Sequence, residues 1–216
     1  MAGTGKMRVA VLISGRGSNM VALLEAARDP AFPAEIVLVL SNRPEAAGLA
    51  RAAEAGIPTR IVDHTAFPDR ASFDAALDAE LRAVSVELVC LAGFMRILTP
   101  GFVAGWAGRM INIHPSLLPL FKGTHTHRQA LDAGVRLHGC TVHFVVPELD
   151  AGPILAQAAI PVRQDDDPDS LADRVIVQER RLYPAVLALV AGGRARLEGD
   201  RVIIAEEAPE GVLFSL

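Results

Sequence analysis

The sequence predicts an α/β fold: a single domain built on a mostly parallel, twisted sheet, with helices on its flanks and antiparallel strands in the C-terminal half. The first observation behind this prediction is that short apolar runs alternate with stretches of helical spacing, as in βαβ units. The second is composition, because 51% of the 216 residues are hydrophobic and only 5% are aromatic. Aliphatic strands of this kind suit burial between helices. We find no internal repeat and no linker, so we expect one domain over residues 1–216.

The first half predicts strands and helices in strict alternation. Its four apolar runs, each the length of a buried strand, are 8–13, 36–40, 57–62 and 86–92. Helical spacing follows three of the runs, at 20–28, 45–55 and 70–84, and Gly56 closes the second helix. A fourth, short helix begins at Pro100 and contains the one tryptophan.

The second half departs from this alternation. A short strand over 110–113 ends at His114 and Pro115, and 128–133 resembles the start of a helix. Two strand-like runs then follow, which either pair antiparallel or extend the sheet at its edge; they are 137–146 and 154–162. Ser170 is predicted to cap a long helix that reaches residue 190 with a kink at Pro184. A hairpin is expected over 197–204.

Charge and composition exclude several classes of partner. The net charge is −4, and the 21 basic residues are scattered, which argues against a nucleic-acid partner. No apolar run reaches the roughly 18 residues that span a membrane. Residues 1–6 are small and polar, so we expect a disordered start without a targeting signal. Cys90 and Cys140 lie in apolar stretches and form no CxxC pair, which predicts buried thiols in a cytoplasmic protein.

The first motif is Ser-Gly-Arg-Gly-Ser-Asn at 14–19, between a predicted strand and a predicted helix. Its glycines allow the backbone to turn tightly, and the N–H groups at a helix N-terminus suit a phosphate. The motif is neither a Walker A loop nor a complete GxGxxG, because residue 20 is Met. A plain turn in which Ser18 caps the helix is the alternative.

The second motif is Asn-Ile-His-Pro-Ser-Leu-Leu-Pro at 112–119. Residues two apart in a strand project from the same face, so Asn112 and His114 would present an amide and an imidazole side by side. Such a pair fits a developing oxyanion, although a buried histidine bonded to local backbone is the alternative. The Leu118–Pro119 bond is a candidate for a cis peptide.

Two loops complete the candidate site. Asp150 lies in a turn between two predicted strands, and a carboxylate beside His114 would favour the imidazolium. The loop 93–98 follows a parallel strand, at the edge where open α/β sheets bind ligands, and its apolar side chains suit a flat heterocycle. Taken alone, Asp150 would be interpreted as a simple turn aspartate, and ordinary loop packing would be the preferred interpretation of 93–98.

The remaining histidines indicate little chemistry. His125 and His127 form an HxH pair, but no neighbouring cysteine or carboxylate completes a metal site. His138 and His143 fall in a predicted strand and are interpreted as structural, and His64 as a surface-loop residue.

Taken together, residues 14–19, 93–98, 112–119 and 148–154 strongly resemble the folate-dependent formyltransferase family. The resemblance runs from about residue 7 to residue 204 without large gaps, and the 112–119 block is its most specific part. It implies a Rossmann-like formyltransferase fold. Within the family, the phosphate loop and the single-domain length favour the branch that formylates glycinamide ribonucleotide over methionyl-tRNA formyltransferases and formyltetrahydrofolate deformylases.

The resemblance also implies roles for individual residues. Asn112, His114 and Asp150 match the catalytic residues of the family. The positions that match the ribonucleotide site are Gly17, Ser18, Asn19 and Glu179. The positions that match the folate site are Arg70, Met95, Arg96, Ile97, Leu98, Val146, Pro147, Glu148, Leu149 and Asp150. Residues 7–110 would thus form a nucleotide-phosphate half, and 111–216 a folate-binding and catalytic half.

Two residues depart from the family pattern. Arg180 stands where a histidine is expected, and Arg16 is unusual in the middle of the phosphate loop. Either arginine is compatible with a phosphorylated substrate.

The implied reaction is direct transfer of the formyl group from 10-formyltetrahydrofolate, a co-substrate, to the amine of glycinamide ribonucleotide in purine biosynthesis. The resemblance implies no metal, only small-molecule partners, and a monomer or a homodimer. The alternatives are a formyltetrahydrofolate deformylase that uses water in place of the amine, and a non-catalytic nucleotide-binding module.

Overall fold

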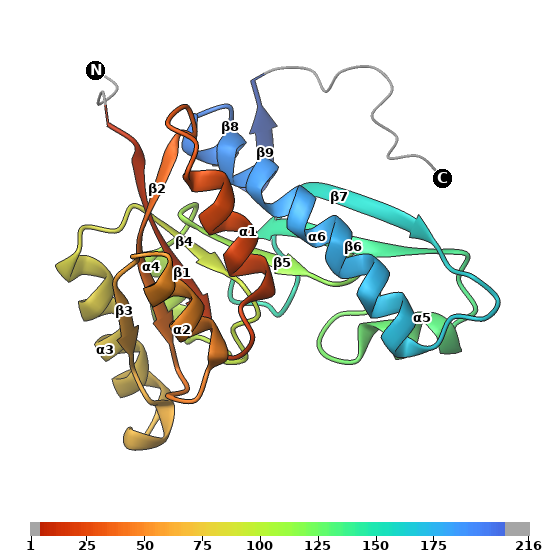
Figure 1. Ribbon diagram of the computed structural model, residues 1–216, viewed down its shortest axis with the longest axis horizontal. Helices are drawn as coiled ribbons and strands as arrows, with labels where there is room; N and C mark the ends of the chain where they lie inside the picture. The colour runs from red at the N-terminus through yellow and green to blue at the C-terminus, as the bar shows by residue number, and fades with distance from the viewer. Residues whose placement is uncertain (1–4, 206–216) are drawn as a thin grey trace.

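The computed structural model describes residues 5–205, and a seven-stranded sheet with the order β3-β2-β1-β4-β5-β6-β7 forms its centre (Figure 1). Strands β1 to β5 run parallel, and β6 and β7 continue the sheet by antiparallel pairing. The strands are β1 (Met7–Ile13), β2 (Ala34–Ser41), β3 (Thr59–Ile61), β4 (Leu88–Leu91), β5 (Met110–His114), β6 (Leu137–Phe144) and β7 (Ile154–Pro161). The predicted fold class is confirmed, and 137–146 and 154–162 fulfil both expectations, pairing antiparallel and extending the sheet.

The helices occupy the connections that the sequence predicts, within a few residues at each end. They are α1 (Ser18–Ala27), α2 (Ala47–Glu54), the 3₁₀ turn η1 (His64–Ala66), α3 (Arg70–Ala83), α4 (Pro100–Gly105), α5 (Thr126–Asp132) and α6 (Pro168–Ala191). A two-stranded hairpin, β8 (Ala195–Glu198) and β9 (Arg201–Ile204), follows α6. Gly199 in its turn has a φ of 58°, a left-handed conformation that favours glycine.

Strand β1 shows why the first apolar run is continuous, since its side chains serve two cores. Val9, Val11 and Ile13 pack in a core with α1, α2 and α6. Ala10 and Leu12 face the other core, which α3 and α4 cover. Successive residues of a strand point to opposite faces, so a strand that is buried on both sides loses the polar alternation of a surface strand.

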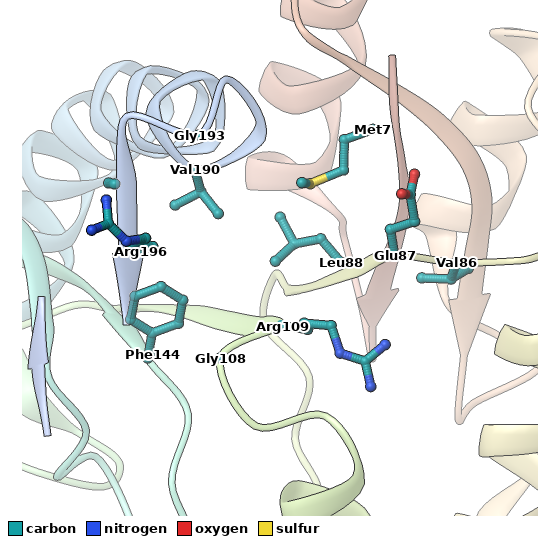
Figure 2. Close-up of a pocket in the computed structure, with 11 residues that line it drawn as sticks. Met7, Val86, Glu87, Leu88, Gly108, Arg109, Phe144, Val190, Gly193 and Arg196 are labelled. Atoms are coloured by element: carbon teal, nitrogen blue, oxygen red, sulfur yellow. The ribbon is translucent and has the colours of Figure 1, made fainter. Parts of the chain in front are cut away.

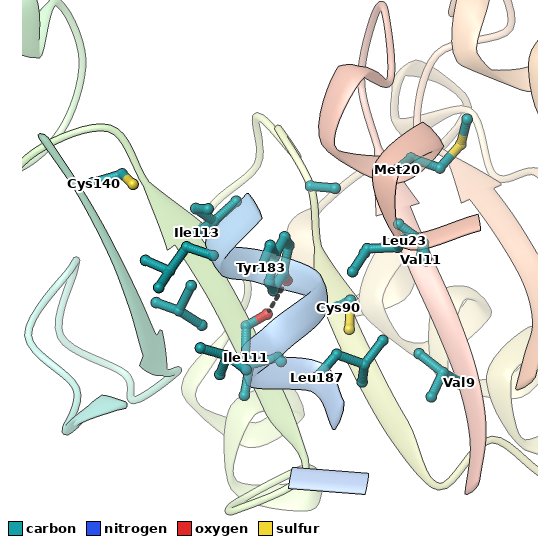
Figure 3. Packing of buried hydrophobic residues seen from close by; sticks show 14 of the residues in the cluster. Val9, Val11, Met20, Leu23, Cys90, Ile111, Ile113, Cys140, Tyr183 and Leu187 are labelled. Atoms are coloured by element: carbon teal, nitrogen blue, oxygen red, sulfur yellow. Dashed lines mark hydrogen bonds between the residues drawn. The ribbon is translucent and has the colours of Figure 1, made fainter. Parts of the chain in front are cut away.

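The long helix α6 is tied to the middle of the sheet by one buried phenol. The Tyr183 hydroxyl lies 3.0 Å from the Leu91 carbonyl oxygen and 3.1 Å from that of Ile111. It thereby joins α6 to two neighbouring strands, β4 and β5, and Figure 3 shows its contact with Ile111. Because a buried hydroxyl needs a partner, this contact fixes the helix over the strands that lead to the site.

One predicted helix cap is wrong. The N-cap of α6 is Asp167, whose carboxylate accepts from the backbone N–H of Ser170, while the Ser170 hydroxyl accepts from the N–H of Asp167. Ser170 is therefore the third residue of a reciprocal capping box and not the cap itself. In α1 the N-cap is Gly17, so the alternative in which Ser18 caps the helix does not hold, and no side chain within residues 5–205 caps it.

The other sequence expectations are met in part. Cys90 and Cys140 are free and buried, as predicted, and burial raises the pKa of each thiol to about 12. Of the expected disordered start, residues 1–4 lie outside the described residues, whereas Lys6 donates to the Asp29 carbonyl at 3.0 Å. Within residues 5–205, no helix combines the length and apolarity needed to cross a membrane.

Candidate functional site

The site lies where the order of the parallel strands reverses. The chain places β2 and β3 on one side of β1, then crosses over to place β4 and β5 on the other. Ligands of open α/β sheets bind outside the carboxyl ends of the strands at such a point. The loops that follow β1, β4 and β5 all begin at this edge, and they contain three of the four predicted motifs.

Strand β5 delivers the first two candidate residues. Asn112 and His114 pair in register with His143 and Thr141 of β6. They occupy alternate positions of one strand and so share a face, as the sequence predicts. His114 is almost fully buried, and its Nε2 lies 2.9 Å from the Phe121 carbonyl oxygen, to which it donates.

Asp150 reaches His114 from the β6–β7 loop. Its Oδ2 lies 3.4 Å from His114 Nδ1, and the side chains are 9% and 6% exposed. The same oxygen accepts from the backbone N–H of Gly123 at 2.8 Å. Both imidazole nitrogens of His114 thus face oxygen acceptors, an arrangement that fits a doubly protonated ring. Spacing in the sequence could not show this meeting of Asp150 and His114.

The loop that holds Asp150 has a demanding backbone. Asp150 has a φ of 47°, a left-handed conformation that non-glycine residues seldom adopt outside functional sites and turns. Two residues later, a Cβ at Gly152 would lie 1.8 Å from the Phe144 carbonyl oxygen. Only glycine permits this close return of the loop to β6.

His143 is the functional candidate that sequence reasoning missed. Its Nδ1 lies 2.8 Å from the Phe144 carbonyl oxygen, so Nδ1 carries the proton. Its Nε2 then accepts from Asn112 Nδ2 at 3.2 Å and lies 4.0 Å from Asp150 Oδ1. Burial lowers the pKa of His143, which keeps the ring neutral. The feature that could have identified His143 is its position opposite Asn112, and this position follows only from the register of β5 and β6.

A buried hydroxyl holds the chain after His114 in place. Thr141 Oγ1 donates to the Ser116 carbonyl at 2.7 Å and accepts from the backbone N–H of Leu118 at 3.0 Å. The Leu118–Pro119 bond is cis, as the sequence predicts. These contacts fix the segment that presents the Phe121 carbonyl to His114.

A pocket of about 480 Å³ opens beside the predicted phosphate loop. It is lined by all six residues of 14–19, by Glu179 and by three arginines, Arg16, Arg43 and Arg180. Gly17 has a φ of 70°, and a Cβ there would lie 3.0 Å from Gly48 Cα, so the loop needs glycine at this position. Backbone N–H groups at the start of α1 and the cationic rim suit an anionic ligand.

Deeper in this pocket, two of the predicted ribonucleotide positions, Asn19 and Glu179, offer hydrogen-bond acceptors. Asn19 Nδ2 donates to Glu179 Oε2 at 2.5 Å, across 160 residues of sequence. Asn19 Oδ1 is buried and has no hydrogen-bond partner among the described residues. Burial raises the pKa of Glu179, which is 6% exposed. The interior of the pocket therefore fits hydroxyl or amine donors, while its rim fits an anion.

A second, smaller pocket of about 110 Å³ is lined by Asn112 and Asp150. Its walls include most of the predicted folate positions: Arg96, Ile97, Leu98, Val146, Pro147, Glu148, Leu149 and Asp150. Phe94, Val103 and Val145 add apolar surface. Ile97 and Leu149 are both more than half exposed at its walls. A flat, largely apolar ligand would cover them.

Two of the predicted folate positions lie elsewhere. Met95 lines the larger pocket, beside the phosphate loop. Arg70 is exposed at the first position of α3 and lines neither pocket. Each pocket also draws on both halves of the chain, since Glu179 joins the phosphate loop and the 96–98 segment joins Asn112.

The remaining histidines do not gather ligands for a metal. His127 Nδ1 lies 3.1 Å from His138 Nε2, which places His127 against another histidine. In the described range 5–205, no group of three His, Cys, Asp or Glu side chains could hold a metal ion. His64 is part of η1 rather than a free surface loop, and its Nδ1 donates to the Asn42 carbonyl at 2.8 Å.

A third hollow, of about 400 Å³, lies at the opposite, amino edge of the sheet (Figure 2). Met7, Leu88, Phe144 and Val190 point into it, and Glu87, Arg109 and Arg196 lie at its margin. These charged groups have local partners: Glu87 accepts from the backbone N–H of Arg8, Arg109 donates to the Gly105 carbonyl, and Arg196 pairs with Glu198. None of the predicted site residues lines this hollow.

The fold and the site together define a class of protein. The Formyl transferase family matches residues 7–187. This chain belongs to that family, and the resemblance inferred from the sequence motifs is confirmed at this level.

Individual members of the family are similar to this chain over most of its length. The chain is 46% identical to the phosphoribosylglycinamide formyltransferase of Escherichia coli, over 89% of this chain and 90% of that protein. It is 53% identical to the trifunctional purine biosynthetic protein adenosine-3 of Bos taurus over 91% of its own length, but it spans only 20% of that longer protein. Among solved structures, glycinamide ribonucleotide transformylase 1 from Symbiobacterium toebii matches with a TM-score of 0.90 and 45% identity, over 94% of this chain and 95% of that one.

Proposed function

We propose that this chain transfers the formyl group of 10-formyltetrahydrofolate to the amine of glycinamide ribonucleotide. One observation carries the proposal: Asn112, His114 and Asp150 converge beside two pockets of different chemistry. Asn112 and Asp150 line the smaller pocket, and Ile113 and Pro115, the chain neighbours of His114, line the larger one. The larger pocket offers a cationic rim and buried acceptors, and the smaller one offers apolar walls. A two-substrate transfer needs this arrangement, because the reacting atoms must meet at one set of polar groups.

The larger pocket would hold the ribonucleotide. Its phosphate would bind the N–H groups of Gly17, Ser18 and Asn19, with Arg16 and Arg180 supplying positive charge. Asn19 Oδ1 and the Glu179 carboxylate would accept hydrogen bonds from the ribose hydroxyls or the amine of the same ligand. The amine end would then point toward Asn112 and His114.

The smaller pocket would hold the folate ring. Arg96 Nε is buried without a hydrogen-bond partner among the described residues and lines this pocket, so it can donate to an acceptor on the ring. Residues 146–150 and Ile97 and Leu98 would contact the faces of the heterocycle. Arg70 and Met95 stay predicted folate contacts, and neither lines this pocket.

The reaction would proceed by direct attack. The amine nitrogen of the ribonucleotide forms a bond to the formyl carbon, and the carbonyl electron pair moves onto oxygen. One N–H of Asn112 donates to His143, so its second N–H is available to that oxyanion. His114, as the imidazolium held by Asp150 and Phe121, adds positive charge beside it.

Collapse of the intermediate would complete the transfer. The bond from the formyl carbon to N10 breaks, and the proton that the amine loses reaches N10 of the leaving folate. The folate carries the one-carbon unit, so the proposed chemistry needs no metal. The proposal includes small molecules as the only substrates, a cytoplasmic location and a monomer or homodimer.

An absorbance assay tests this function. Purified protein is mixed with a 10-formyltetrahydrofolate analogue and glycinamide ribonucleotide, and each is omitted in turn. We expect folate product only when the ribonucleotide is present. Product without the ribonucleotide would instead identify a deformylase. Absence of product in both cases would contradict the assignment of the catalytic residues.

A further inference from the structure

Ser14 is the residue at which the two substrate loops meet. Its backbone N–H donates to the Gly93 carbonyl at 3.1 Å. Its Oγ accepts from the backbone N–H of Met95 at 2.7 Å and donates to Asn42 Oδ1 at 2.5 Å. One buried side chain thus joins the loop after β1 to the end of β2 and to the loop after β4.

The chemistry of this position calls for a hydroxyl. A hydroxyl can donate and accept at the same atom, whereas a methyl group can do neither and a carboxylate only accepts. Asn42 is fully buried, and its backbone carbonyl oxygen accepts from His64 Nδ1 at 2.8 Å. Ser14 therefore bonds to a partner that is held in place by a second contact. The bond to Asn42 can thus fix the position of the Ser14 hydroxyl.

The two joined loops belong to different pockets. Residues 14–19 line the larger pocket, and Arg96, Ile97 and Leu98 line the smaller one. Met95, between them in space, lines the larger pocket while its backbone N–H is held by Ser14. A change in the length of the Ser14–Met95 contact would displace one loop relative to the other.

We propose that Ser14 is a positioning residue that sets the distance between the ribonucleotide loop and the folate loop. This inference rests on the proposed function, and it assigns to Ser14 and Asn42 a role outside direct contact with the reacting atoms. Each loop still forms its own pocket without the link, so each substrate still binds. The attacking amine and the formyl carbon then meet in a poorer geometry.

The kinetic test compares two buried serines of the same sheet edge. Ser14→Ala removes the two hydrogen bonds of the hydroxyl, to Asn42 and Met95, and keeps the backbone bond to Gly93. Ser41→Ala is the matched control. Ser41 is also buried, but among the described residues its hydroxyl bonds only to the N–H and carbonyl of Arg43, within its own turn. We expect Ser14→Ala to lower kcat about 10- to 100-fold, since displacement of about 1 Å has effects of that order. Both KM values should stay near those of the native chain, and the control should keep native kcat.

A double-mutant cycle sharpens the test. Asn42→Ala removes the fixed partner of Ser14, so it should lower kcat in the same way, and the double variant should lose little more than either single one. A loss confined to KM, additive losses, or equal losses in Ser14→Ala and Ser41→Ala would overturn the proposal. If Ser14→Ala does not fold, comparing the kcat of Asn42→Ala with that of Ser41→Ala still tests the proposal.

Amide hydrogen exchange separates this inference from the proposed function. In the unliganded protein, Ser14→Ala should speed exchange in the 93–98 segment, at Met95 above all, and Ser41→Ala should not. Unchanged exchange there would overturn the link itself. A native chain that lacks formyl transfer would overturn the function while leaving this measurement interpretable.

Discussion

The two edges of the central sheet carry hollows of similar size and opposite character. The carboxyl-edge pocket has a volume of about 480 Å³, and the amino-edge hollow about 400 Å³. At the amino edge, Glu87, Arg109 and Arg196 are each paired with a nearby group. At the carboxyl edge, Asn19 Oδ1 and Arg96 Nε are buried without partners among the described residues.

Buried polar atoms without partners, and not volume, separate these two hollows. A buried polar atom without a partner costs about 1–3 kcal/mol. The left-handed backbone of Asp150 adds a further cost at the same edge. Such costs concentrate where a ligand can supply the missing partner, so we expect changes at the carboxyl edge to affect turnover and changes at the amino edge to leave it unaltered.

The largest effect is expected from the catalytic pair on β5. Asn112→Ala and His114→Ala should each lower kcat about 100- to 1,000-fold, because each removes stabilisation of the oxyanion. Steady-state kinetics measure the loss, and thermal unfolding checks that both variants stay folded. Near-native turnover in either variant would contradict its assigned role.

The second prediction concerns the stability cost of the carboxyl edge. His138 is fully buried, and burial lowers its pKa to about 4. The unfolded chain therefore takes up a proton near pH 6.5, before the folded chain does. Stability should fall as the pH drops from about 6.5 to about 4, by up to about 3 kcal/mol from this group.

Urea unfolding across that pH range measures the effect. His138→Gln cannot take up the proton, so its free energy of unfolding should change less between pH 7 and pH 4.5. Parallel pH curves for the native chain and the variant would show that His138 is not responsible.

The third prediction tests His143, whose contact with Asn112 could not be predicted from sequence spacing. His143→Leu removes the acceptor that holds the Asn112 amide, so we expect kcat to fall about tenfold, less than for loss of the oxyanion donor itself. His143→Gln keeps an acceptor oxygen and should retain more activity. Equal kcat in the two variants would indicate that His143 only fills space.

His143 and Ser14 show where sequence reasoning reaches its limit. The continuous apolar run from Val9 to Ile13 predicts a strand because its residues are buried on both faces of the sheet, and the run records that burial. The contact of His143 with Asn112 depends on β5–β6 register, and that of Ser14 with Asn42 on strand order. Neither leaves a periodic signal.

The candidate site divides in the same way. Asn112 and His114 are two apart on one strand, so their proximity follows from strand geometry alone. Asp150 joins them only because its loop returns at Gly152, and Glu179 reaches Asn19 from α6. The family resemblance supplied these two residues where local physics could not. The cap of α6 was misplaced because Asp167 and Ser170 are both good capping residues.

The fourth prediction concerns the cationic rim of the larger pocket. Arg16→Ala and Arg180→Ala should each raise the KM for the ribonucleotide about fivefold, since each removes a charged contact to phosphate, while kcat changes little. The KM for the folate serves as an internal reference. Arg28→Ala, at the opposite end of α1, is the matched control. A fall in kcat alone would place these arginines in the chemistry rather than in binding.

The smallest effect is expected at the amino edge. This prediction tests directly whether the amino-edge hollow differs in function from the carboxyl-edge pocket. Arg196 and Glu198 are both about half exposed, so their ion pair should contribute less than about 1 kcal/mol. Arg196→Ala should therefore lower the free energy of unfolding slightly and leave kcat and both KM values unchanged. Urea unfolding and steady-state kinetics on one preparation measure both. A change in turnover would mean that the amino-edge hollow affects the site although its charges are paired. The pairing of charges would then not distinguish a hollow left by packing from a functional pocket.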